Sequence, residues 1–78
     1  MTRIEKLIER IRARPPEADF RDVMRLLEAF GYDRKRQEGS HVSFKKPGAR
    51  ALIVPLSSGR KVKRVYLDQI CELLGLDD

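Results

Sequence analysis

The chain has 78 residues, of which 41% are hydrophobic and 37% charged, a balance typical of a folded globular protein and not of a disordered one. It has no apolar run long enough to span a bilayer and no pure apolar stretch near the N-terminus, so we expect neither a membrane helix nor a signal peptide. The one cysteine excludes an internal disulfide and a cysteine-based metal cluster. Together these features predict a cytoplasmic protein.

Positive charge is concentrated in the middle of the chain. Residues 1–31 contain seven Lys/Arg and six Asp/Glu, residues 32–66 contain ten Lys/Arg and two acids, and residues 67–78 contain four acids and no base. A concentrated positive segment favours a polyanion through counterion release, with binding that weakens steeply as salt rises. A solvated surface remains the alternative, because a charge field concerns association and solubility rather than fold.

The first predicted helix spans residues 3–13, where apolar residues recur at helical spacing. Pro15-Pro16 ends it, because Arg14 precedes a proline and is therefore disfavoured in the α region. This break allows the helix to be an appendage to the rest of the chain. Its apolar stripe either pads the core or binds a partner, and we favour the core.

Two further amphipathic helices are predicted over residues 20–30 and 65–74. Asp19 is expected to cap the first of these, with Asp22 as a weak capping-box partner. Gly31 stands where such a helix closes in a left-handed C-cap. The apolar stripes of these two helices can cover one face of a sheet.

Between these two helices the hydrophobic period changes to that of short strands. The expected strands and turns are residues 32–37 (strand), 38–40 (turn), 41–46 (strand), Pro47-Gly48 (turn) and 51–54 (strand), which Pro55 ends. The predicted order is therefore α-α-β-β-β-α. It favours an α+β fold, a two-layer sandwich in which helices cover one face of a three-stranded antiparallel sheet.

The middle strand alternates between apolar and polar residues. Val42 and Phe44 share one face, whereas His41, Ser43 and Lys45 share the other. The apolar face is expected to meet the helices. The polar face stays open to solvent and is the natural place for a ligand.

His41 is the one histidine of the chain and the residue best suited to proton transfer near neutral pH. A lone exposed histidine is usually an ordinary surface residue, but here cations accompany it on the same hairpin. They can hold a phosphodiester and stabilise the charge that grows on it during cleavage. These cations are Arg34, Lys35, Arg36, Lys45 and Lys46.

Other candidate groups carry weaker signals. A nucleophilic Ser40 beside His41 is disfavoured, because adjacent strand residues point to opposite faces and no orienting acid is evident. Cys71 falls on an apolar helix face, where a small core residue is expected. Tyr32 and Tyr66 either stack on bases or pack in the core or at its rim.

An ordered series of motifs resembles the HicA (YcfA-like) toxins, whose pattern is G-[FY], R-x-x-G-S-H, F, P and V-P. The matching segments are Gly31-Tyr32, the run from Arg36 through Gly39-Ser40-His41 to Phe44, Pro47-Gly48, Val54-Pro55, and Gly59 to Arg64 followed by Leu67, Ile70 and Gly75-Leu76. The resemblance covers roughly residues 20–76. It implies a core of residues 17–78 with residues 1–16 as a helical extension, within one domain of residues 1–78.

The resemblance further implies a double-stranded-RNA-binding-like fold and the toxin of a type II toxin–antitoxin pair. Such toxins cleave mRNA without a metal or other cofactor and are silenced by a HicB-type antitoxin that covers the active site. The catalytic histidine of the family corresponds to His41, and we expect a monomer alone or a hetero-oligomer with the antitoxin. The expected RNA-binding residues are Arg34, Lys35, Arg36, Ser40, Ser43, Lys45, Lys46, Arg60, Lys61, Lys63 and Arg64.

Two positions depart from the family pattern. Many relatives have a second histidine directly after the first, where this chain has Val42, and many have one after the V-P pair, where it has Leu56-Ser57-Ser58. If that later histidine assists catalysis, this protein is impaired. Three hypotheses therefore stay open: an endoribonuclease, a non-catalytic RNA-binding module, and a degenerate toxin kept for its antitoxin contacts. The sequence favours the first, because His41 stands in its family context within the basic segment.

Overall fold

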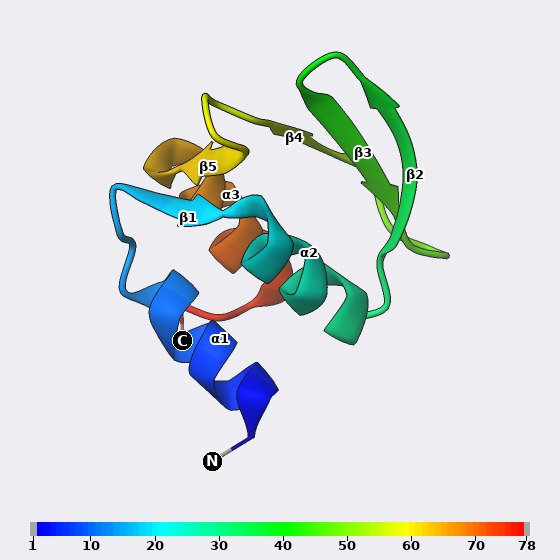
Figure 1. Cartoon of the computed structure of the whole chain (residues 1–78). Helices are drawn as coiled ribbons and strands as arrows, with labels where there is room; N and C mark the ends of the chain where they lie inside the picture. Colours follow the sequence, from blue (N-terminus) through cyan, green and yellow to red (C-terminus); the bar gives the residue numbers. More distant parts are fainter. Residues whose placement is uncertain (1, 78) are drawn as a thin grey trace.

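The computed structural model describes residues 2–77 and contains three helices and five strands (Figure 1). In chain order these are α1 (Arg3–Arg12), β1 (Glu17–Asp19), α2 (Phe20–Ala29), β2 (Asp33–Glu38), β3 (His41–Lys45), β4 (Leu52–Pro55), β5 (Lys61–Lys63) and α3 (Arg64–Leu74). The predicted α+β class, the three helices and the three-stranded antiparallel sheet are confirmed. No helix of the described part of the chain is both long enough and apolar enough to cross a membrane.

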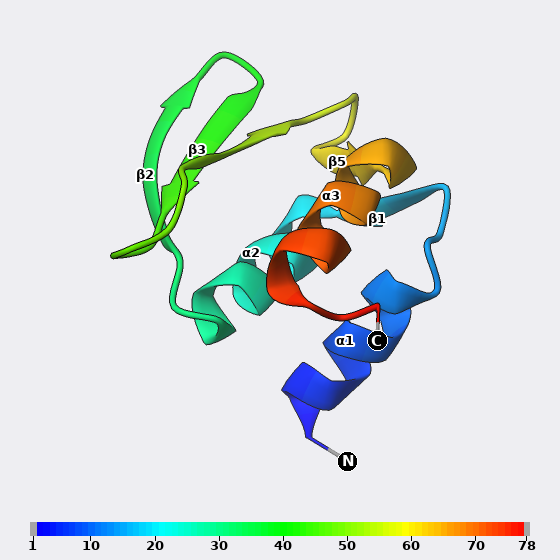
Figure 2. The ribbon, with the colours of Figure 1, turned by 180° about the vertical axis from the view of Figure 1, so that it is seen from behind.

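The three-stranded sheet has the order β2-β3-β4, with β3 in the centre and every pairing antiparallel. One face of this sheet is buried, because Val42 and Phe44 of β3 and Val54 of β4 are at most 1% exposed. Figures 1 and 2 show the sheet as a separate layer, with α2 and α3 together on one side of it. No helix in the described part of the chain lies over the other face, as the alternation of β3 predicted.

The core joins this sheet face to all three helices. From α1 it contains Ile11, which is fully buried, and Leu7 is buried beside it. Cys71 of α3 is also fully buried, and this burial raises the pKa of its thiol. It is a core residue, as its place on an apolar helix face predicted.

A second, two-stranded sheet pairs β1 with β5, and the sequence did not predict it. Each strand has only three residues, and Ala18 opposite Val62 is its one buried pair. So short an alternation is indistinguishable from a loop in sequence. The sheet nevertheless joins the entrance of α2 to the entrance of α3, because these helices begin directly after β1 and β5.

The expected N-cap of α2 is confirmed in its position but not in its hydrogen bonding. Asp19 occupies the N-cap position, but its side chain makes no capping hydrogen bond and pairs with Lys61 across the small sheet instead. Asp22 is no capping-box partner, since it forms an ion pair with Arg10 of α1 at 2.9 Å. Both carboxylates therefore pair with cations from other elements, and neither makes the capping hydrogen bond that sequence spacing suggested.

Several predicted boundaries also shift by a residue or two. The strand expected to begin at Tyr32 begins at Asp33, because Tyr32 is 3% exposed and packs in the core. Glu38, predicted as a turn residue, ends β2 and pairs with His41. Pro55, predicted to end the third strand, is the last residue of β4 and pairs with His41. Proline is tolerated there because β4 is an edge strand and needs no donor on its free side.

We predict that Ile11→Ala lowers the free energy of unfolding by about 2–4 kcal/mol, the usual range for truncating a buried isoleucine. The reason is that Ile11 is fully buried and packs α1 against the core. Urea denaturation followed by circular dichroism measures the change. The matched control is Ile53→Ala, which truncates the same side chain where it is 49% exposed. Equal losses for the two variants would show that α1 is an appendage.

Candidate active site

His41 is the first residue of β3 and lies on the uncovered face of the sheet. A two-residue turn, Gly39-Ser40, precedes it and joins β2 to β3. Gly39 has φ +57°, as the first central residue of a II′ hairpin turn requires, so the hairpin closes tightly. The closing pair places Glu38 directly opposite His41, and Pro55 of β4 is its neighbour on the other side.

The exposed His41 side chain lines an open concavity of 350 Å³. Its lining residues come from all three strands: Arg36, Glu38, His41, Ser43 and Ile53. The structure thus brings together three of the predicted site residues, namely Arg36, His41 and Ser43.

Glu38 is a member of this concavity that sequence reasoning missed. Its carboxylate forms an ion pair with the Arg36 guanidinium at 2.5 Å, and both groups are well exposed. The signal was present in the sequence, because a two-residue turn sets its flanking residues opposite each other across the hairpin. An imidazole, a guanidinium and a carboxylate therefore share one open surface. This set can exchange a proton and hold an anion.

The other predicted residues of the hairpin do not line this concavity. Lys45 is on the same face and pairs with Asp33 at the far end of the two strands. Lys35 lies at a bulge between the Arg34–Phe44 and Arg36–Ser43 pairs. The Lys46 ammonium lies 5.6 Å from the centre of the Tyr32 ring. Ser40 belongs to the turn, where its carbonyl accepts a hydrogen bond from the Leu56 N–H.

Arg34 lies on the opposite face of the sheet from His41. The bulge at Lys35 turns it toward the helices, where its guanidinium is 5.9 Å from the centre of the Phe20 ring. Arg60 approaches the same ring at 5.3 Å. The two guanidinium groups help to cover Phe20, which is only 2% exposed.

The predicted residues of β5 and of the start of α3 are partly engaged in holding the fold. The hydrogen bond and charge of Lys61 hold the pKa of the Asp19 carboxyl below its usual range, and Asp19 in turn raises the pKa of Lys61. The Arg64 Nε donates to the Arg14 carbonyl at 2.9 Å. Lys63 is exposed on this strand, and none of these side chains lines the His41 concavity.

Comparison with known families bears directly on this arrangement. The chain matches the family model described as "HicA toxin of bacterial toxin-antitoxin" over residues 20–76. The chain belongs to the HicA toxin family. The match includes β2, β3, β4 and both helices that cover the sheet, and therefore every residue of the His41 concavity. Searches of the curated proteins and of the solved structures find no significant match.

The structure places both departures from the HicA pattern outside the His41 concavity. Val42 is fully buried and faces the helices, so a side chain at this position does not reach the open face. Ser57 is half-buried, and its hydroxyl donates to the Lys61 carbonyl at 3.1 Å. With Tyr66 and Lys63 it lines a separate hollow of 190 Å³ beside Pro55. Tyr32 is buried and has no face free for base stacking.

Within residues 2–77, no three or more His, Cys, Asp or Glu side chains are grouped so that they could hold a metal ion. At the concavity, the residues of metal-ligating type are His41 and Glu38, which pair across the hairpin.

We predict that Arg34→Ala lowers the free energy of unfolding by about 0.5–2 kcal/mol, because it removes a cation–π interaction and part of the cover of Phe20. The neighbouring Lys35→Ala, at the exposed bulge, is the control and is expected to change it by less than about 0.5 kcal/mol. Chemical denaturation of both variants measures the difference. If the two variants lose stability equally, Phe20 does not depend on its arginine cover.

Proposed function

We propose that this toxin is a metal-independent endoribonuclease that cleaves mRNA, with His41 as general acid and base. One observation carries the proposal: the single histidine lies in an exposed concavity together with Arg36 and Ser43, on the face of the three-stranded sheet that no helix of residues 2–77 covers. The open strand face admits a flexible RNA strand. The family match supports the toxin role, and the geometry supports the residue.

The proposed reaction is an internal phosphoryl transfer. His41 accepts the proton of a 2′-OH, and the 2′-oxygen bonds to the adjacent phosphorus while the bond to the 5′-oxygen breaks. The imidazolium returns that proton to the leaving 5′-oxygen, which gives a 2′,3′-cyclic phosphate and a 5′-hydroxyl. A single histidine performs both transfers in turn, or shares one with water or Lys45, so we expect slow turnover.

Arg36 is the cation best placed to stabilise the charge that builds on the phosphate. Its ion pair with Glu38 holds the guanidinium at the edge of the concavity in the free protein. An entering phosphate competes with Glu38 for the same donors, and both anions match the planar guanidinium fork. Once Arg36 binds the phosphate, the Glu38 carboxylate would lose part of its ion pair with Arg36 while still facing His41 across the hairpin.

The antitoxin of the pair is the second partner in this proposal. We infer that it is of the HicB type and blocks the open sheet face, since any protein covering β3 on that side excludes RNA from His41. The catalytic core comprises residues 17–78, and residues 1–16 extend it with a helix whose Leu7 and Ile11 are buried. A non-catalytic RNA-binding or antitoxin-binding module is the second candidate, favoured by the serine at position 57 in place of a family histidine.

We predict that His41→Ala reduces cleavage of a single-stranded RNA by about 10²–10⁴-fold, the usual contribution of a general acid–base group. RNA affinity and the free energy of unfolding should stay near the wild-type values, because the imidazole is exposed and outside the core. Gel analysis of labelled RNA measures cleavage, and fluorescence anisotropy measures binding.

Two controls accompany this experiment. An RNA with a single 2′-deoxynucleotide at the cut site should resist cleavage there, because the attacking oxygen is missing. Excess EDTA should leave the rate unchanged. A wild-type protein that binds RNA but never cuts it would contradict the enzyme hypothesis and favour the non-catalytic RNA-binding module.

We predict that Arg36→Gln lowers kcat by about 10–100-fold, since it removes a charged donor from the developing anion. Arg34→Gln removes the same charge from the same strand, but from the helix-covered face, and should change kcat by less than about threefold. Steady-state cleavage assays, run well below the unfolding temperature of both variants, compare them. Equal reductions of kcat would mean that only net charge matters and would contradict the placement of Arg36.

A further inference from the structure

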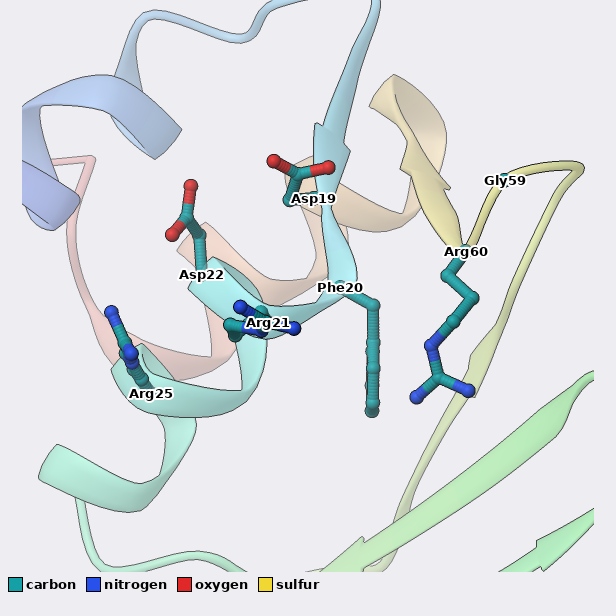
Figure 3. A pocket seen from close by; sticks show the side chains of 7 residues that line it. All are labelled: Asp19, Phe20, Arg21, Asp22, Arg25, Gly59 and Arg60. Atoms are coloured by element: carbon teal, nitrogen blue, oxygen red, sulfur yellow. The ribbon is translucent and has the colours of Figure 1, made fainter.

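A second basic hollow lies at the beginning of α2, apart from the His41 concavity. It measures 480 Å³ (Figure 3). Its lining residues are Asp19, Phe20, Arg21, Asp22, Arg25, Gly59 and Arg60. Arg21 and Arg25 stand one helical turn apart on α2, and Arg60 comes from the turn before β5 and lies alongside Phe20.

The charges of this hollow are not balanced. Its two acids are each neutralised by a cation that does not line it, Asp19 by Lys61 and Asp22 by Arg10. In contrast, none of its three arginines forms an ion pair with any carboxylate of residues 2–77. Three guanidinium groups therefore line one concave surface without an ion pair to hold them, and only the charge of Arg21 acts measurably on a carboxyl of the hollow, that of Asp19.

The start of α2 also contributes a partial positive charge, which Asp19 at the N-cap and Asp22 in the first turn partly offset. The first turn of α2 borders the hollow, and the N-cap Asp19 makes no side-chain hydrogen bond to that turn. Helix N-termini carry a partial positive charge and unsatisfied N–H groups, which favour an anion. The three arginines are therefore the main source of positive charge in the hollow.

The hollow is linked to the His41 hairpin through one aromatic ring. Arg60 lies on the Phe20 ring at 5.3 Å, and Arg34 of β2 lies on the same ring at 5.9 Å. Two residues further along β2, Arg36 lines the His41 concavity on the opposite face. Because β2 is an edge strand, a flexible chain can pass around its free side from one basic surface to the other.

We propose that the hollow of Arg21, Arg25 and Arg60 binds a backbone phosphate of the same RNA whose scissile phosphate lies at His41. This rests on the proposed function, since it assigns a second contact to that substrate. A nucleic acid repeats its charge at every nucleotide, so it can engage both basic surfaces at once. Arginine suits this task, because its planar fork matches phosphate oxygens in pairs.

The test measures RNA affinity in full-length protein carrying His41→Ala, so that the RNA stays intact. The probe is a fluorescein-labelled single-stranded RNA of about 12 nucleotides, within the site sizes of single-strand binders. The test variant is Arg21→Gln with Arg25→Gln. The control is Arg3→Gln with Lys6→Gln, which removes the same charge from exposed positions on α1, outside the hollow.

The test variant should bind about tenfold more weakly, and the slope of log K against log salt should fall by about 0.7 for each phosphate that the protein no longer neutralises. The control pair should change the affinity by less than about twofold and leave the slope intact. Equal effects of the two pairs would show only non-specific attraction and overturn the proposal. Unchanged RNA binding with weakened antitoxin binding in the test variant would also overturn it, and would make the hollow a protein-docking site.

Cleavage assays with His41 intact separate this proposal from the enzymatic one. Wild-type protein that shows the arginine-dependent slope but cuts no RNA would leave the phosphate site standing and remove the catalytic role. The opposite result is that the wild type and the Arg21→Gln, Arg25→Gln variant cut RNA equally well and bind it with the same salt slope. That result would remove the phosphate site and leave the catalytic role of His41 standing.

Discussion

The alternation of β3 is the constraint on which the rest of the structure depends. Val42 and Phe44 are both fully buried against the helices, and Phe44 lies 6.1 Å from Phe20 between ring centres. A shift of one residue in register would bury His41 and expose this apolar pair, so the core fixes the direction of the histidine. The energy that orders the proposed active site therefore comes from hydrophobic burial on the other side of the same strand.

The cations of the middle segment do several different things. Arg34 and Arg60 cover an aromatic ring, Lys61 pairs with Asp19, and Arg64 bonds to the backbone before β1. Of the lysines and arginines in residues 2–77, Arg36 alone lines the His41 concavity. A cation that already touches protein is still able to meet a phosphate, but its removal then changes stability as well as binding. Substitutions in this segment are interpretable only when both quantities are measured.

The sequence was sufficient for the helices, for the central sheet and for the exposed side of β3, because each rests on a repeated pattern of apolar residues. It was insufficient for the position of Arg34. Simple alternation along β2 would place Arg34 on the same sheet face as Arg36, but the bulge at Lys35 puts it on the opposite face. It also missed Arg21 and Arg25, which lie in a segment of nearly balanced charge. Their acidic neighbours are paired to cations from other elements, and such pairings appear only in three dimensions.

The G-S-H motif itself separates into three physical roles. Gly39 has a positive φ of +57°, and nothing lies within 4 Å of a Cβ built there, so the turn conformation alone requires glycine. The Ser40 carbonyl accepts a hydrogen bond from the Leu56 N–H at 2.7 Å, which ties the turn to the segment after β4. His41 then begins the strand with its side chain outward and Glu38 opposite. Two residues of the motif thus build the hairpin end, and the third is exposed on the open face of the sheet.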